Sequence, residues 1–235
     1  MEPILGAGGV IPPHKSFAPM VRDICDRYGI LLITDEVITA YGRTGAWSGS
    51  RLWGIKPDMM CTAKAITSGY FPFGAVMLGE KMVEAFEGNK DAKIAHGYTY
   101  SGHPVGAAAA LACLAETQRL NVIVNAAARG TQLFEGCKAL QEKYELIGDV
   151  RGGHGLMTGI EVVSDRANKT PIDAARATII QDTTYEAGAM VRVSGPNILL
   201  SPPLILTEAE ASTILSALDA GFAAAQKATG ANHVK

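Results

Sequence analysis

The sequence predicts an α/β protein: part of a domain built on a mainly parallel sheet, followed by a small α+β domain. Two short apolar runs, residues 30–34 and 59–63, have the length and composition of central strands in a parallel sheet. Each run leads directly into an ionisable residue, Asp35 and Lys64. After Gly148 the pattern changes to short strands and helices, which is typical of a separate α+β unit.

The first part of the chain alternates strands and helices. Residues 16–28 form an amphipathic pattern with Ser16 as the expected N-cap and Gly29 as the expected stop. The loop that follows Asp35 contains four glycines and two tryptophans, and a loop of that length is usually functional. The other elements expected here are strands at 2–5 and 73–79 and helices at 104–120 and 121–144.

The second part begins with a pair of strands across residues 149–163, interrupted by the turn Arg-Gly-Gly-His-Gly at 151–155. A glycine-rich phosphate loop is a poor interpretation of this turn, because the strand–loop–helix context is missing. The remaining expected elements are a helix at 174–187, strands at 189–193 and 197–200, and a helix at 208–225. We therefore place a domain boundary near residue 145, which gives domains at 1–145 and 146–235.

Composition excludes several classes of function. The 235 residues are 48% hydrophobic and 19% charged, with a net charge of −2, so nucleic acid is not an expected partner. No apolar stretch is long enough for a membrane span, and no signal sequence is evident. The four cysteines are widely spaced and the histidines lack ligand spacing, so we expect a cytoplasmic protein without disulfides or a metal site.

Asp35 and Lys64 are the main candidates for chemistry. Ligands of open α/β sheets bind beyond the carboxyl ends of the strands, so both side chains are expected on one rim, in a dry crevice. A lysine there suits a Schiff base, and an aspartate suits a pyridinium nitrogen, which together is what pyridoxal phosphate (PLP) requires. The plainer alternatives are a surface lysine at a strand end and an aspartate that caps the following turn.

Thr99 and Arg192 are further candidates for binding anionic groups. Thr99 lies in a turn rich in glycine and serine, just before a helix at Pro104, which suits a phosphate, although it is also an ordinary turn residue. Arg192 precedes an apolar strand and is a candidate carboxylate clamp. Its alternative is a surface arginine in a salt bridge.

Several spaced motifs resemble class III PLP-dependent aminotransferases, most closely the ω-amino acid:pyruvate and amine transaminases. The resemblance covers nearly the whole chain, and the motifs follow in the same order. They are residues 33–37 (ITDEV), 41–45 (YGRTG), 63–64 (AK), 72–76 (PFGAV), 96–104 (HGYTYSGHP) and 200–204 (LSPPL).

The resemblance implies a PLP-transferase type I large domain in which Lys64 holds the cofactor as an internal aldimine, the Schiff base of this family. It implies that Asp35 binds the pyridine nitrogen and that Val37 packs on one face of the ring. It also implies that Thr99 binds the cofactor phosphate of the neighbouring subunit, whose pocket Tyr98 lines. A homodimer with shared active sites follows.

For substrates, the resemblance makes Arg192 a mobile arginine that binds the carboxylate of the keto acid. Glu2 matches a glutamate that neutralises this arginine in some relatives. The implied reaction moves an amino group from an amine or ω-amino acid to a keto acid such as pyruvate, with Lys64 as the proton carrier. Fold alone does not determine the reaction, so an aminomutase or decarboxylase on the same scaffold stays open.

The sequence departs from the family pattern at its N-terminal end. Family members carry further residues ahead of this segment, including a phosphate cup and the aromatic residue that stacks on the other face of the cofactor. We therefore expect a C-terminal portion of such an enzyme, with weak or no activity alone. A silent or split fragment that only dimerises or binds a partner chain, such as a missing N-terminal half, is the alternative.

Overall fold

The computed structural model describes residues 1–230, which form two compact units. Unit 1 comprises Met1–Ile4 and Pro13–Ile123, and unit 2 comprises Leu5–Pro12 and the chain from Val124 onward. The units thus divide just inside a long helix, at Ile123. The domain boundary near residue 145 stays a prediction.

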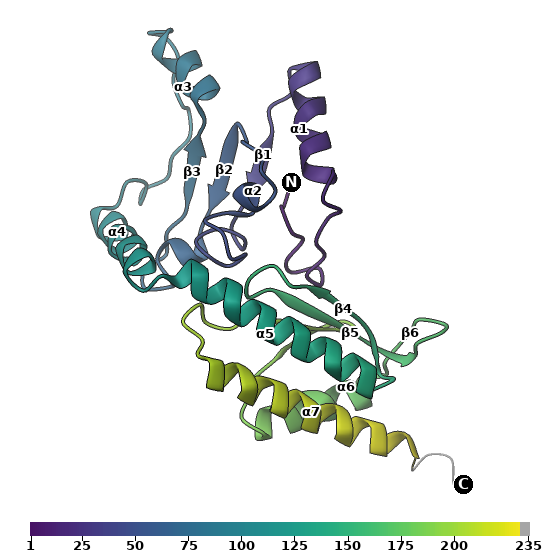
Figure 1. Cartoon of the computed structure of the whole chain (residues 1–235). Helices are drawn as coiled ribbons and strands as arrows, with labels where there is room; N and C mark the ends of the chain where they lie inside the picture. Colours follow the sequence, from purple (N-terminus) through teal and green to yellow (C-terminus); the bar gives the residue numbers. More distant parts are fainter. Residues whose placement is uncertain (231–235) are drawn as a thin grey trace. The chain divides into compact units, whose positions relative to one another are not determined.

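Unit 1 is built on a three-stranded sheet in the order β1-β2-β3 (Figure 1). Strands β1 (Ile33–Asp35) and β2 (Met59–Thr62) are parallel, with Asp35 opposite Cys61. Strand β3 (Ala75–Leu78) is antiparallel to β2. The two strands predicted to carry Asp35 and Lys64 therefore run side by side and end at the same edge.

The helices expected in unit 1 at residues 16–28 and 104–120 are present, and three further short helices in its described residues were not predicted. Helix α1 (Phe17–Tyr28) ends at Gly29, whose positive φ of 67° confirms the predicted stop. The other helices are α2 (Gly49–Leu52), the 3-10 helix η1 (Lys64–Ile66), α3 (Glu80–Glu87) and α4 (Pro104–Arg119). The strand expected at residues 2–5 is wrong: Leu5 makes only an isolated bridge to Ile11, closing a glycine-rich turn between them.

Unit 2 has an antiparallel sheet in the order β4-β5-β8-β7, with a short β6 paired to β5 (Figure 1). The strand pair predicted across residues 149–163 is confirmed by β4 and β5. Its strands are β4 (Ile147–Gly152), β5 (Thr158–Asp165), β6 (Thr170–Pro171), β7 (Arg192–Ser194) and β8 (Asn197–Leu200). Its helices are α5 (Val122–Lys143), α6 (Ala174–Glu186) and α7 (Glu208–Gly230).

The core of unit 2 gathers apolar side chains from its helices and its sheet. Phe222 of α7 is fully buried, and its ring stacks on that of Tyr144 with centroids 5.8 Å apart. Ile160 from β5 and Ile180 from α6 join the same cluster. This cluster is the largest block of apolar burial in the described chain, so most of the hydrophobic stabilisation comes from unit 2.

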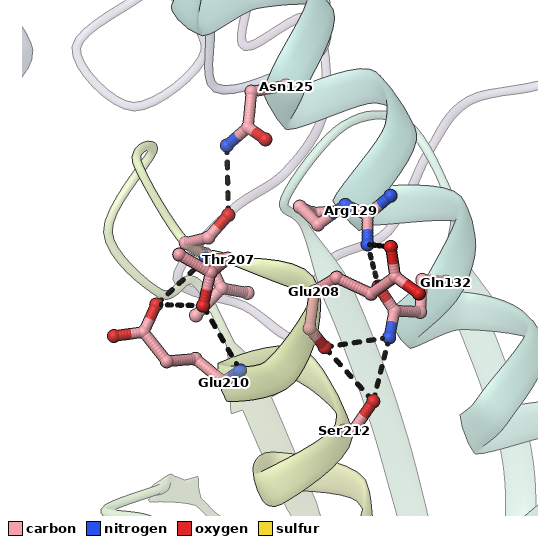
Figure 2. Close-up of polar contacts among 8 residues, drawn as sticks. Asn125, Arg129, Gln132, Thr207, Glu208, Glu210 and Ser212 are labelled. Atoms are coloured by element: carbon pink, nitrogen blue, oxygen red, sulfur yellow. Dashed lines mark hydrogen bonds and ion pairs between the residues drawn. The ribbon is translucent and has the colours of Figure 1, made fainter.

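Helix α7 begins with a capping box, and side chains of α5 donate hydrogen bonds to the same region (Figure 2). The Thr207 hydroxyl accepts a hydrogen bond from the Glu210 N–H, and the Glu210 carboxylate accepts one from the Thr207 N–H at 2.8 Å. From α5, Asn125 donates to the carbonyls of Leu204 and Leu206, and Gln132 donates to the Glu208 carbonyl. These bonds hold the segment after the Pro-Pro pair against α5.

Within residues 1–230, no single helix has the length and apolar composition that crossing a membrane needs. Helices α4 and α5 meet those requirements only when taken together as a bent pair, by length and composition alone.

Candidate active site

Strands β1 and β2 bring Asp35 and Lys64 to one edge of the sheet, as predicted. Asp35 is the last residue of β1, and Lys64 lies three residues beyond its strand partner Cys61. The Asp35 carboxylate accepts a hydrogen bond from the Val37 N–H at 3.0 Å, which fixes its direction relative to the following turn. A carboxylate and an amine thus share the edge at which ligands of α/β sheets bind.

Both side chains are exposed in this structure, so the expectation of a dry crevice around them is not met. The reason lies in the local geometry. Residues of β1 alternate in burial, and Asp35 falls on the exposed face while Thr34 is fully buried. Lys64 has left the strand and begins η1, so β3 does not cover it by pairing.

Lys64 lies in a strained turn. Its φ is +46°, and Ser68 and Gly69 also have positive φ, at +50° and +81°. A residue with a side chain held in this region costs on the order of 1–3 kcal/mol, and such strain is concentrated at functional sites. The sequence pattern had predicted a lysine at a strand end, but it carried no sign of this left-handed geometry.

The Lys64 turn is held by contacts from helix α4 and from the turn itself. Cys113 of α4 donates to the carbonyl of Ala65 at 3.4 Å and lies 3.2 Å from the Ser68 hydroxyl. The Thr67 hydroxyl donates to the Phe71 carbonyl at 2.7 Å. These bonds offset the energetic cost of the strained backbone. They also fix the backbone position from which the Lys64 side chain extends.

Glu36, next to Asp35, was missed by sequence reasoning. Its side chain is fully buried, and it accepts hydrogen bonds from Thr39, Gly49 and Ser50. A carboxylate this deeply buried is uncommon, because burying a charge is costly unless hydrogen bonds satisfy it. The available signal was the strand alternation, which places residue 36 on the same face as the buried Thr34.

The loop after β1 returns to the end of β2. The Tyr41 hydroxyl donates to the Thr62 hydroxyl at 3.1 Å, and the Tyr41 N–H donates to the Trp47 carbonyl. Desolvation lowers the pKa of Arg43, in the same loop, to about 10. The loop is therefore an ordered part of the edge that carries Asp35 and Lys64.

Tyr98 and Thr99 lie in a turn ahead of α4, both exposed. The turn is closed by the Ser101 N–H, which donates to the Tyr98 carbonyl at 2.9 Å, and by the Tyr98 N–H, which donates to the Ser101 hydroxyl. His103 caps α4 by accepting from the Val105 N–H. Within the described residues, no hydrogen bond joins this turn to Asp35 or Lys64.

The predicted substrate residues fall in different units. Arg192 begins β7 of unit 2, opposite Leu199 of β8, and its side chain is exposed. Glu2 is half-buried in unit 1. Their role in binding a carboxylate stays a prediction.

Comparison with solved structures identifies the fold as that of a transaminase. An amine transaminase from an uncultivated Pseudomonas species, in the PLP-bound (internal aldimine) form, matches with 47% identity and a TM-score of 0.90. That match covers 94% of this chain and 51% of the other. An (S)-enantioselective omega-transaminase from Thermomicrobium roseum matches with 38% identity and a TM-score of 0.88, over 95% of this chain and 50% of that one.

The chain belongs to the aminotransferase class-III family, whose model matches residues 1–221. Among its relatives, the taurine–pyruvate aminotransferase of Bilophila wadsworthia is 36% identical over 98% of this chain and 52% of its own length. A probable mitochondrial gamma-aminobutyrate transaminase 3 of Oryza sativa subsp. indica is 39% identical over 92% of this chain and 42% of its own. The chain thus spans about half the length of these relatives.

The family and the PLP-bound neighbour imply PLP as the cofactor. The residues at the sheet edge fit this group by their chemistry. Lys64 supplies an amine on a constrained backbone, and Asp35 supplies a carboxylate that one backbone N–H already orients. The chemistry of Lys64 and Asp35 is thus compatible with the cofactor that the family implies.

Proposed function

We propose that this chain takes part in PLP-dependent transfer of an amino group from an amine or ω-amino acid to a keto acid such as pyruvate. The observation that carries the proposal is the parallel pairing of β1 and β2, which places Asp35 and Lys64 on one edge of the sheet in a class III aminotransferase. The amine and taurine–pyruvate transaminases among the relatives support these substrate classes.

Lys64 would hold the cofactor through its Nζ amine, and the same amine would carry protons during the reaction. As general base and acid, Nζ would take a proton from the substrate carbon and later return one. When bound, PLP would supply an electron sink for this proton abstraction. Asp35 keeps a proton on the ring nitrogen through its carboxylate, which stabilises the charge left by proton abstraction.

The remaining predicted residues have supporting roles in this proposal. Val37 packs on the ring, and Arg192 binds the carboxylate of the keto acid, with Glu2 balancing its charge in the absence of a carboxylate. Thr99 binds the phosphate of the neighbouring subunit's cofactor, and Tyr98 lines that pocket.

This arrangement requires a homodimer with shared active sites. It is supported by the exposure of Tyr98 and Thr99 and by the apolar side chains that α4 presents to solvent, among them Val105 and Leu111. We also propose a cytoplasmic location, supported by four cysteines that all remain free thiols.

A second candidate function is a silent or split chain that only dimerises or binds a partner. The exposed apolar side chains of α1, Phe17, Met20 and Ile24, favour it, because exposed apolar surface marks interaction sites. An aminomutase or decarboxylase on the same fold is distinguished by product analysis, since only transamination consumes a keto acid stoichiometrically.

The test is an absorbance titration of the purified chain with PLP, with Lys64→Ala and the matched control Lys81→Ala. Lys81 is an exposed lysine of the same unit, in the first turn of α3. We expect a visible band that survives in Lys81→Ala, disappears in Lys64→Ala, bleaches with an amine and returns with pyruvate. A band that is equal in both variants would contradict the proposed role of Lys64, and no band at all would favour the partner-binding chain.

A further inference from the structure

We propose that Glu36 is a positioning residue whose buried carboxylate holds the end of β1 so that Asp35 and Val37 face the cofactor. The inference rests on the proposed function, because it gives a role to a neighbour of two residues in that site. It concerns how the chain's own residues are held, so it is open to measurement without catalysis.

The Glu36 carboxylate is completely enclosed and completely hydrogen-bonded. Oε1 accepts from the Ser50 N–H at 2.6 Å and from the Ser50 hydroxyl at 2.5 Å. Oε2 accepts from the Gly49 N–H at 2.7 Å and from the Thr39 hydroxyl at 2.5 Å. Four hydrogen bonds to one enclosed carboxyl group, two of them from backbone N–H groups, hold this part of the chain firmly in place.

The cluster joins the end of β1 to the start of α2, where Gly49 also packs closely against Pro3. The Ser50 hydroxyl also lies 3.2 Å from the Thr34 hydroxyl, so Ser50 bridges two residues of the β1 end. The backbone of α2 approaches Glu36 closely at Gly49, where an added Cβ would lie 2.4 Å from Pro3 Cβ and 3.2 Å from Glu36 Oε2. Only glycine fits at that point without displacing Pro3.

Glu36 acts on Asp35 through the backbone. Thr34 and Glu36 are buried on one face, and Asp35 faces the other way. The Glu36 N–H donates to the Cys61 carbonyl at 2.8 Å, and the next N–H, of Val37, donates to the Asp35 carboxylate. A backbone shift at residue 36 would therefore disturb the bond that directs Asp35.

Because all four partners of the Glu36 carboxyl group are donors, Glu36→Gln tests whether these bonds hold residue 36 in place. Each oxygen accepts a backbone N–H and a hydroxyl, and no basic group bonds to this carboxylate in the described chain. A glutamine keeps the shape, but its NH₂ group faces a backbone N–H in either orientation. Two donors then oppose each other in a buried place, which forces residue 36 to move.

The matched control is Asp58→Asn. Asp58 is another largely buried carboxylate of unit 1, which accepts from the Leu32 N–H at 2.7 Å and from Arg22 at 2.9 Å. Asp58 directly precedes the first residue of β2, whereas Lys64 follows the other end of the same strand. The control therefore lowers the stability of the same unit without touching the Asp35 edge.

The experiment measures two properties of the full chain for both variants. One is the change of the Val37 amide proton shift with pH, which reports its bond to the Asp35 carboxylate. The other is the apparent Kd for PLP from absorbance. We expect Glu36→Gln to abolish the pH response of Val37 and to weaken PLP binding by about tenfold or more, whereas Asp58→Asn leaves both as in the wild type.

A Glu36→Gln chain with the wild-type Val37 response and PLP affinity would overturn the inference, and so would equal losses in Asp58→Asn. If Glu36→Gln does not fold, Ser50→Ala replaces it, since it removes one donor to Oε1 and the bridge to Thr34. The same criteria apply to it. If the wild-type chain shows no Lys64-dependent PLP band, the proposed function fails for this chain, and the Val37 response still decides the role of Glu36.

Discussion

The two units of this protein bury different kinds of side chain. In unit 2 the largest fully buried side chains are apolar, such as Phe222, Leu133 and Ile160. In unit 1 they include Glu36 and Thr34, and most of the large apolar side chains that remain exposed also lie in unit 1. Unit 2 is therefore held mainly by hydrophobic burial, whereas the candidate active-site edge of unit 1 is held by polar contacts.

This difference shows how the chain separates stability from chemistry. Apolar burial is non-directional and tolerates small shifts, which suits a unit that supplies a stable core. Positioning a carboxylate or an amine needs directional bonds, and these surround Asp35 and Lys64. Non-glycine residues with positive φ mark the same edge, at Tyr41, Lys64 and Ser68.

The largest change in stability is expected from a substitution in the core of unit 2. Phe222→Ala removes a fully buried ring and should lower the free energy of unfolding by about 3–5 kcal/mol. Leu32→Ala, in the smaller cluster of unit 1 with Cys25 and Ile55, should cost about 2 kcal/mol.

Denaturant unfolding followed by two signals would separate these effects. Both tryptophans, Trp47 and Trp53, lie in unit 1, so their fluorescence reports that unit, while circular dichroism reports the helices of both. Phe222→Ala should shift the circular dichroism midpoint more than the fluorescence midpoint. A larger loss in Leu32→Ala than in Phe222→Ala would contradict the assignment of the main core to unit 2.

A smaller effect is expected from two glycines of α5. An added Cβ at Gly130 would lie 2.0 Å from the Gly155 carbonyl oxygen, which is backbone and cannot move aside. At Gly136 it would meet Leu215 Cδ1 at 2.3 Å, at the end of a flexible side chain. Gly130→Ala should therefore destabilise by about 1–3 kcal/mol, despite the helix preference for alanine.

Gly136→Ala is the matched control for this prediction, in the same helix and with the same chemical change. Its loss should be smaller, because Leu215 has other rotamers and alanine favours the helix by about 1 kcal/mol. Thermal unfolding of both variants would measure the difference. Equal stability of Gly130→Ala and wild type would show that α5 and the β4–β5 turn do not pack as closely as described.

The smallest effect is a pH dependence in the turn between β4 and β5. Burial lowers the pKa of His154 below its ordinary value of 6.5. The unfolded chain then binds more protons than the folded one as the pH falls through 6.5, so His154 should reduce stability at lower pH. His154→Asn should lose less stability than wild type between pH 7.5 and 5.5, measured by the denaturant midpoint. An unchanged pH slope would exclude this contribution.

Sequence alone was sufficient for the features that depend on local pattern. The apolar runs before Asp35 and Lys64 predicted two parallel strands that end at one edge, and the structure has this arrangement. Helix α1 and its stop at Gly29 followed from amphipathic spacing and the left-handed preference of glycine. The family motifs are local as well, and the family match over residues 1–221 agrees with them.

Only the tertiary structure decided which side chains are buried and which meet over long distances. Strand alternation places Glu36 on the buried face, but its donors Gly49 and Ser50 come from a later segment that only folding brings next to it. The exposure of Lys64 and its left-handed φ likewise depend on a turn held by Cys113. The physical reason is that hydrogen-bond partners and packing space come from segments brought together by folding, and local spacing does not encode these pairings.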